Sequence, residues 1–137
     1  MPRILAIDYG LKRTGLAVTD PLKIIASALV TVETPQLFNF LKAYFAKEPV
    51  ELIIIGDPRN LDDSDTHATL HVQKTLARLA KEFPAIPVKT VDERYTSRMA
   101  KAAMLTMGMK KMQRRDKSMV DKIAATIMLQ EYMERHP

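Results

Sequence analysis

The stretch Leu52-Ile53-Ile54-Ile55-Gly56 is an unbroken run of large aliphatic residues that ends at a glycine. Strands covered by helices on both faces read as continuous apolar runs, whereas strands with one wet face alternate apolar and polar residues. We therefore predict a strand that is buried on both faces. The apolar run that leads to Asp8 near the N-terminus predicts a second buried strand, parallel to the first.

Three further strands are predicted from short apolar or β-branched segments. A turn over residues 10–14 joins the strand predicted for residues 3–9 to one at residues 15–19. A β-branched segment predicts another strand at residues 26–32, which completes an antiparallel meander. The last strand is predicted at residues 86–91 and again leads into acidic residues.

Four helices are predicted between and after the strands. Pro35 marks the start of the first helix, which ends before Pro49. The second is predicted for about residues 66–83, the third for residues 97–107, and the fourth follows a basic loop at residues 109–116. Apolar residues predicted to mark the packing stripes are Leu37, Phe38, Leu41 and Phe45 in the first helix, Leu70, Leu76, Leu79 and Ala80 in the second, and Met119, Val120, Ile123, Ile127 and Met128 in the last.

This order of elements predicts an α/β protein with one five-stranded mixed sheet. Three strands form the antiparallel meander, two more run parallel to the first strand, and about four helices flank the sheet. At 137 residues and 47% hydrophobic content, the chain can build one core without cross-links. We therefore expect a single domain over residues 1–137.

The composition excludes several classes of site. The chain has no cysteine, so a disulfide framework and a thiolate zinc site are both excluded, and its three histidines are badly spaced for a zinc cage. Any metal must be held by oxygen ligands. The N-terminal stretch has neither the length of a spanning helix nor the layout of a secretory signal, so we expect a cytoplasmic protein with no membrane partner.

Basic residues are concentrated near the C-terminus. The formal net charge is +5, and residues 94–122 hold nine basic residues against two acidic ones, Asp116 and Asp121. Clustering of this kind suits a polyanionic partner. The alternative is a solvated helix face followed by a basic loop, which is the usual explanation of a charge run.

Three carboxylates are predicted to meet at one edge of the sheet. Asp8 and Glu93 end predicted strands, and Asp121 lies near the start of a helix whose Ala124 and Ala125 allow a close approach to the sheet. Clustered acids stay ionised only beside cations, and two Mg²⁺ or Mn²⁺ ions would serve the hydrolysis of a phosphodiester. Taken singly, each acid is also typical of an ordinary strand end or first helical turn.

Basic side chains surround this predicted metal site and are predicted to bind phosphates. Such contacts give affinity without sequence specificity. Tyr9 and Tyr95 are candidates for stacking on unpaired bases, although burial is the commoner fate of a tyrosine at a strand end. The predicted nucleic-acid-binding residues are Lys12, Arg13, Arg94, Arg98, Lys110, Lys111, Arg114, Arg115 and Lys117.

Three motifs in the same order and spacing resemble the YqgF family, also called RuvX, whose members are proposed to process precursor 16S ribosomal RNA. The motifs are DYGLKRTGLAV at residues 8–18, DERYTS at residues 92–97, and VDKIAA at residues 120–125 followed by Leu129-Gln130. Together they span nearly the whole chain. Departures from the family pattern are Asp57 in place of a leucine, Asp63 in place of a glycine, and Tyr95 in place of a leucine.

The resemblance implies an RNase H-like fold with catalytic, metal-binding acids at Asp8, Glu93 and Asp121. It also implies a divalent-metal-dependent endonuclease that matures the 5′ end of pre-16S rRNA, with RNA in pre-ribosomal particles as its partner. The departures leave these acids unchanged but put the shape of the loop between Asp57 and Ser64 in question. Asp57 is either a further acidic contact or an ordinary loop carboxylate.

Other functions remain open from the sequence. A Holliday junction resolvase would keep the fold and metals, cut branched DNA and work as a dimer, so the chain is either a monomer or a homodimer. A non-enzymatic RNA-binding assembly factor would need the basic residues but not the acids. A nucleotide-binding unit of the actin-like kinase fold also uses an Asp-x-Gly turn, but 137 residues are too few for its second lobe.

Overall fold

A single mixed sheet organises the computed structural model, which describes residues 2–20, 22, 25–57, 69–92 and 117–135. The strand order is β3-β2-β1-β4-β5. Pairing of β1 with β2 and of β2 with β3 is antiparallel, whereas β1 with β4 and β4 with β5 are parallel. The strands are β1 Arg3–Asp8, β2 Arg13–Thr19, β3 Ala26–Glu33, β4 Val50–Asp57 and β5 Val88–Asp92.

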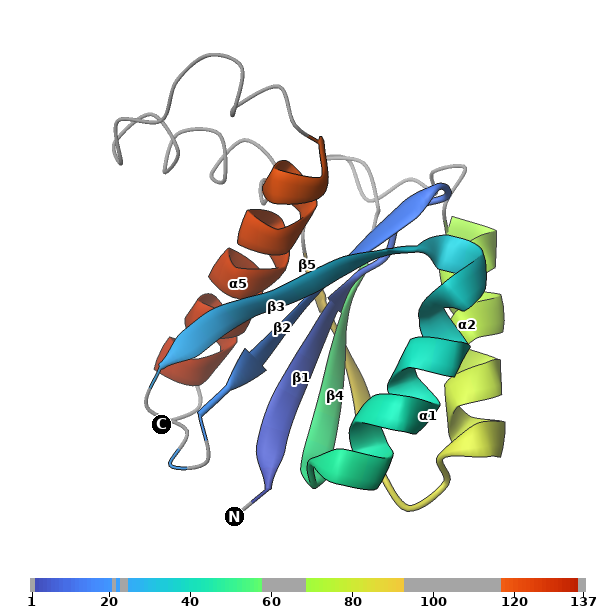
Figure 1. The fold of residues 1–137 in the computed structure, drawn as a ribbon, viewed down its shortest axis with the longest axis horizontal. Helices are drawn as coiled ribbons and strands as arrows, with labels where there is room; N and C mark the ends of the chain where they lie inside the picture. The colour runs from blue at the N-terminus through green and yellow to red at the C-terminus, as the bar shows by residue number, and fades with distance from the viewer. Residues whose placement is uncertain (1, 21, 23–24, 58–68, 93–116, 136–137) are drawn as a thin grey trace.

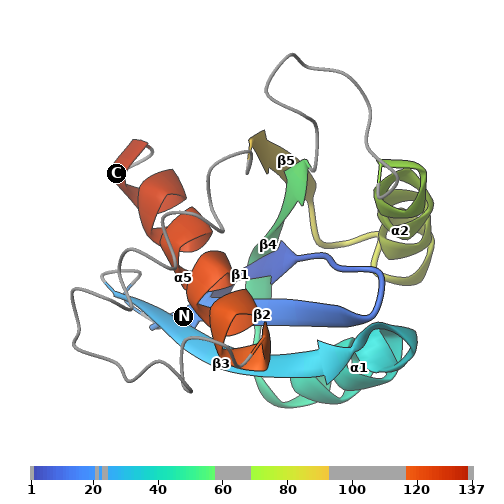
Figure 2. The same cartoon turned by 90° about the horizontal axis from the view of Figure 1, so that it is seen from above.

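Helices cover both faces of this sheet in the described part of the chain. Helices α1 (Leu37–Lys47) and α2 (Thr69–Glu82) lie on one face, and α5 (Lys117–Arg135) crosses the other (Figures 1 and 2). A short 3-10 helix, η1 (Thr34–Gln36), leads into α1. No helix among the described residues has the length and apolar character needed to cross a membrane.

Alternation along the strands separates two hydrophobic cores. Successive side chains of a strand point to opposite faces, so odd and even residues of β1 enter different cores. The core under α1 and α2 comprises Leu5, Ile7, Leu16, Val18, Leu37, Phe38, Leu41, Ile53, Ile55, Val72 and Leu79. The core under α5 comprises Ala6, Ala17, Ile54, Ala125, Met128, Leu129 and Tyr132.

Small residues line the contact between α5 and the centre of the sheet. Ala6 and Ala17 are paired neighbours on β1 and β2, and both are fully buried. Ala125 of α5 belongs to the same core and is also fully buried, and Ala124 beside it is buried. Short side chains on both surfaces let the helix lie close to the strands, as the sequence predicted for Ala124 and Ala125.

The structure confirms the predicted α/β class and the five-stranded mixed sheet. Each predicted strand is present, with its ends moved by a few residues. The first helix ends where Glu48 adopts an extended conformation, since the following Pro49 disfavours a helical residue before it. Three α-helices are described rather than about four, because the helix predicted for residues 97–107 lies outside the described residues.

The predicted packing stripes of two helices are partly wrong. In α2, Leu79 is fully buried, but Leu70 and Ala80 are exposed. The buried stripe of α2 instead follows Val72, Thr75 and Leu79, at spacings of three and four residues that keep one face toward the sheet.

In α5, the buried stripe is likewise displaced by about one residue from the prediction. Met128 is buried as predicted, whereas Ile123 and Ile127 are only half-buried. Ala124, Ala125, Leu129 and Tyr132 take the sheet-facing positions with Met128. Close packing of small residues, rather than side-chain size, decides which face of this helix is buried.

Enlarging Ala125 should destabilise the protein. Ala125→Leu inserts a branched side chain into a fully buried contact, and overpacking of this kind costs about 1–3 kcal/mol. Urea unfolding measures the change. Ala43→Leu, at an exposed position of α1, is the matched control and should stay within about 0.5 kcal/mol of wild type. Equal stability of the two variants would contradict close packing of α5 on the sheet.

Candidate active site

Asp8 ends the central strand of the sheet. It is the last residue of β1, which has β2 and β3 on one side and β4 and β5 on the other. Because β4 and β5 run parallel to β1, their last residues, Asp57 and Asp92, come to the same edge and pair in register. Ligands of open α/β sheets collect at this carboxyl edge of parallel strands.

Glycines lie on both sides of Asp8 across the sheet. Asp8 pairs directly with Gly15 of β2. On the other side, β1 and β4 pair Ile7 with Ile55, so the next position along β4 beside Asp8 is Gly56. Residues paired across strands share a face, and neither neighbour carries a side chain to cover the half-buried carboxyl group of Asp8. The sheet surface beside Asp8 is therefore built from backbone.

The N-terminal end of α5 lies at this same edge. Figure 1 shows α5 starting near the end of β1 and running back toward the N-terminus of the chain. Ala6 and Ala125 share one core; Asp8 lies two residues farther along β1, and position 121 lies one helical turn before Ala125. The backbone thus brings position 121 toward the edge where Asp8 lies, while the side chain of Asp121 lies outside the described part.

A closed set of hydrogen bonds fixes the turn after Asp8. The Thr34 hydroxyl donates to the Gly10 carbonyl oxygen at 2.6 Å, so its contact of 3.0 Å with Thr14 has the Thr14 hydroxyl as donor. The Gly10 N–H in turn donates to Thr14 Oγ1 at 3.5 Å. A Cβ added at Gly10 would collide with the Arg13 carbonyl oxygen, so the turn requires glycine there. These contacts hold the backbone that follows Asp8.

The structure places only part of the predicted site. Asp8 is described, but Glu93 lies outside the described residues, immediately after the end of β5. Within the described residues, no three acidic or histidine side chains group as metal ligands. Convergence of Asp8, Glu93 and Asp121 therefore stays a prediction.

Of the predicted phosphate contacts, Lys12 is exposed in the turn and Arg13 is half-buried at the start of β2. Lys117 begins α5, and only its backbone is described. Asp63, Tyr95 and six predicted phosphate contacts lie outside the described residues: Arg94, Arg98, Lys110, Lys111, Arg114 and Arg115. Sequence reasoning also missed Gly15 and Gly56, whose place beside Asp8 follows only from strand register.

Comparison with known proteins identifies the family. A family model described as "RuvX: Holliday junction resolvase" matches residues 2–135. The chain belongs to the RuvX family. RuvX-family membership agrees with the resemblance seen in the three sequence motifs.

Curated RuvX-type relatives match over almost their full length. A protein of Christiangramia forsetii is 52% identical over 133 residues, covering 97% of this chain and 98% of the relative. A protein of Porphyromonas gingivalis is 51% identical over 134 residues, covering 98% and 97%. Both relatives carry the name "Putative pre-16S rRNA nuclease".

Solved structures confirm that this RuvX-family chain has the RNase H-like fold of resolvases. Thermus thermophilus RuvC in complex with a Holliday junction substrate matches with a TM-score of 0.58 and 16% identity, covering 99% of this chain and 97% of that protein. Fowlpox virus resolvase in complex with Holliday junction DNA matches with a TM-score of 0.58 and 12% identity, covering 97% of each. At these identities, the likeness concerns the fold alone.

Removing the Thr14 hydroxyl should destabilise the turn after Asp8. Thr14 is fully buried, and Thr14→Val keeps its shape while leaving the Gly10 N–H without its acceptor. A buried group that loses its partner costs about 1–3 kcal/mol, measured here by urea unfolding. Thr90→Val, at an exposed position of β5, is the control and should change stability little. Equal effects of the two substitutions would contradict a structural role for the hydrogen bonds.

Proposed function

We propose that this protein is a divalent-metal-dependent endonuclease that cleaves phosphodiester bonds of RNA, and that it acts in 5′-end maturation of pre-16S rRNA. The observation that carries the proposal is the position of Asp8 at the carboxyl end of the central strand, between two glycines and near the start of α5. The curated relatives at about half identity, named as nucleases of this RNA, support the choice of substrate.

The chemistry of the donors fits a hard divalent cation. Asp8 supplies carboxylate oxygens at an edge where its two neighbours across the sheet are glycines, which add no side chain beside it. Carboxylate oxygens suit Mg²⁺ and Mn²⁺. In the proposal, Glu93 and Asp121 join Asp8 in holding two such ions. When bound, the ions supply an activated water and stabilise the leaving oxygen of the phosphodiester.

The chain's own residues position the substrate in this proposal. The hydrogen bonds among Gly10, Thr14 and Thr34 hold the backbone that follows Asp8, and so hold its carboxylate in place at the edge of the sheet. In-line displacement requires metal ligands held in a defined position. Lys12, in the turn after Asp8, is exposed and available to a phosphate oxygen. The other basic residues predicted from the sequence would bind the flanking phosphates, which gives affinity without reading bases.

A second candidate substrate is branched DNA. The description of the family model names a Holliday junction resolvase, and two structures with the same fold hold Holliday junctions. Those structures are at most 16% identical to this chain, whereas the relatives named as RNA nucleases reach 52%. The higher identity favours RNA, and junction cleavage by a homodimer is the alternative that the cleavage experiment tests.

Asp8→Asn should abolish cleavage. The amide keeps the shape of the side chain but removes the negative charge that holds a cation, so we expect a loss of at least about 100-fold, comparable to removing one strong electrostatic contact in a transition state. The assay follows a labelled pre-16S rRNA fragment and, separately, a four-way DNA junction with Mg²⁺, Mn²⁺ or EDTA. Glu134→Gln is the control, at an exposed position near the far end of α5.

The outcomes separate the candidate functions. RNA cleavage that needs metal and Asp8, with wild-type activity in the Glu134→Gln variant, supports the proposal. Junction cleavage alone would replace RNA with branched DNA as substrate. Full activity of the Asp8→Asn variant would overturn the proposed site. RNA binding without cleavage, lost on charge reversal at Arg114 and Arg115 but kept in Asp121→Asn, would indicate an assembly factor.

A further inference from the structure

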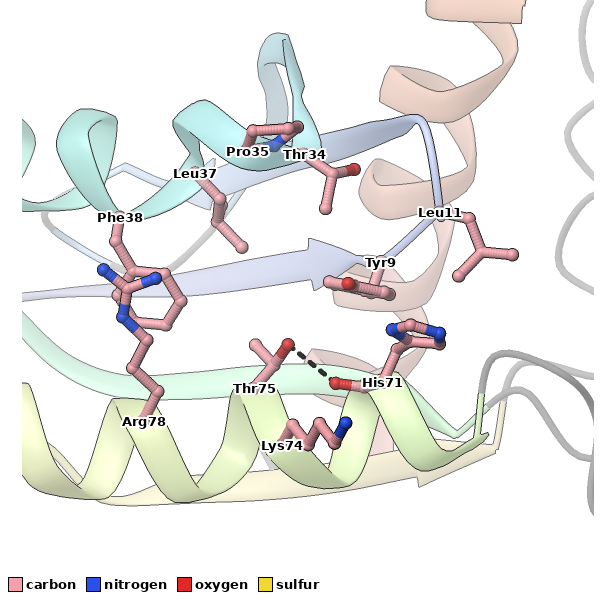
Figure 3. A pocket seen from close by; sticks show the side chains of 10 residues that line it. All are labelled: Tyr9, Leu11, Thr34, Pro35, Leu37, Phe38, His71, Lys74, Thr75 and Arg78. Carbon is pink, nitrogen blue, oxygen red and sulfur yellow. Dashed lines mark hydrogen bonds between the residues drawn. The ribbon is translucent and has the colours of Figure 1, made fainter.

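A groove lies between α1 and α2, on the opposite face of the sheet from α5. The turn after β1, the start of α1 and one side of α2 form its walls (Figure 3). Its volume is about 360 Å³, within the usual range of small-molecule sites, roughly 300–1,000 Å³. The residues that line this α1–α2 groove are Tyr9, Leu11, Thr34, Pro35, Leu37, Phe38, His71, Lys74, Thr75 and Arg78.

The charge of the groove suits an anion. None of the described residues that line it is acidic, and α2 contributes His71, Lys74 and Arg78 at spacings of three and four residues, along one side of the helix. Within the described part of the chain, no carboxylate pairs with Lys74 and no group bonds to the His71 ring. Both side chains are exposed.

Arg78 is already engaged and defines the far end of the groove. Its guanidinium lies 3.9 Å from the centre of the Phe38 ring and donates a hydrogen bond to Glu82. This hydrogen bond is the main cause that holds the pKa of the Glu82 carboxyl below its ordinary value, and Lys42 adds to it. Lys74 is therefore the groove cation best placed to receive a phosphate.

The wall opposite Lys74 suits a flat ring. Tyr9 is half-buried, packs on the core under α1 and α2, and has no partner for its hydroxyl within the described residues. Leu11 beside it is 53% exposed, so it adds accessible apolar surface to this wall of the groove. Figure 3 shows the His71 ring on the α2 side of Tyr9 and Leu11. Aromatic and apolar side chains of this kind stack on unpaired bases.

The groove adjoins the candidate active site through one peptide bond. Tyr9 follows Asp8 directly and packs against the core under α1 and α2. Asp8, two residues after Ala6 of the α5 core, points to the opposite face because side chains alternate along a strand. A polynucleotide that crosses the carboxyl edge of the sheet at Asp8 therefore meets the groove on the other face. A free mononucleotide would fill the same volume, so the occupant of the groove is either one nucleotide of a strand or a free nucleotide.

We propose that the α1–α2 groove binds one unpaired nucleotide of the substrate RNA, with the base against Tyr9 and a phosphate at Lys74. This inference rests on the proposed function for the identity of the polymer. It assigns α2 to substrate binding, through His71 and Lys74, in addition to the basic residues near the acids. In the sequence, only the spacing of His71, Lys74 and Arg78 points to this groove. The rest of its lining comes from the turn after β1 and from the start of α1, which the fold brings beside α2.

Binding of a labelled single-stranded oligouridylate to the full-length Asp8→Asn protein in EDTA tests the groove without cleavage. Lys74→Gln should weaken binding and reduce the slope of log affinity against log salt concentration by about 0.7, the value for one phosphate contact on a single strand. Tyr9→Leu should weaken binding about 5- to 150-fold, since it removes the ring on which one base stacks. Lys81→Gln, exposed on α2 outside the groove, is the matched control and should bind like the parent protein.

Two further measurements use the same Asp8→Asn protein and need no substitution in the groove. With a 5-iodouridine RNA, photo-crosslinking to the Asp8→Asn protein should label the peptide that contains Tyr9. Uridine 5′-monophosphate should compete only weakly with the oligouridylate, because it lacks the neighbouring phosphate contacts of a strand. Equal affinities for the mononucleotide and the strand would overturn the assignment to substrate RNA, and so would crosslinks confined to other peptides.

The remaining outcomes separate this inference from the proposed function. If Lys74→Gln changes affinity and salt slope no more than Lys81→Gln, the groove does not bind a phosphate, while cleavage by the wild-type protein still stands as a separate result. If groove variants weaken RNA binding but wild type cuts no nucleic acid, the groove stands and the nuclease proposal fails. An RNA duplex with the same sensitivity to Tyr9→Leu would overturn binding of an unpaired nucleotide.

Discussion

Burial of β1 on both faces is the constraint on which the rest of this structure depends. Leu5 and Ile7 enter one core, and Ala6 enters the other, so neither face of the strand can meet water. Two helices on one side and α5 on the other satisfy this requirement, and the parallel pairing with β4 follows because a crossover through α1 covers the first face. The functional edge of the sheet is a product of the same burial, since β1, β4 and β5 all end there.

The two cores use different means of packing. Under α1 and α2 the sheet presents large aliphatic side chains, and the helices meet them with residues such as Leu41 and Leu79. Under α5 the sheet presents Ala6 and Ala17 beside Ile54, and Ala125 lies in the same core. A helix held close over small residues has little freedom to shift along the sheet, because interiors are close-packed. This contact therefore determines where the start of α5 lies relative to Asp8.

The sequence predicted the strands well because their signals are local. Apolar runs and β-branched segments mark each strand. Pro35 lies in η1, just before α1 begins at Leu37, and Pro49 follows the end of α1. The predicted packing stripe of α2 was partly wrong because the spacing of leucines alone does not show which side of a helix faces the sheet. Leu70 is exposed, whereas Thr75 is buried. Tertiary contact, rather than hydrophobicity, decided those positions.

Less of the candidate site could be predicted, because its parts are brought together by strand register. Asp8 was predicted from its own segment. Gly15 and Gly56 become its neighbours only because β1 pairs with β2 on one side and with β4 on the other. The α1–α2 groove depends on three separate elements in the same way. Composition and spacing carry no information about such neighbours until the order of strands and their register are known.

The register of β1 also determines that the neighbouring residues Asp8 and Tyr9 point to opposite faces of the sheet. A slip of one residue in β1 would turn Asp8 toward the α1–α2 groove and Tyr9 toward α5. The same slip would bring Ala6 under the large residues of α1 and α2, and Leu5 and Ile7 under the alanines that allow α5 to lie close. Core packing thus fixes the faces of the sheet toward which Asp8 and Tyr9 point. The hydrogen bonds of Thr14 and Thr34 hold the backbone of the turn that follows them. Asp8 and Tyr9, the acid and the ring of the two proposals, are thus directed to opposite faces of the sheet by the packing of β1.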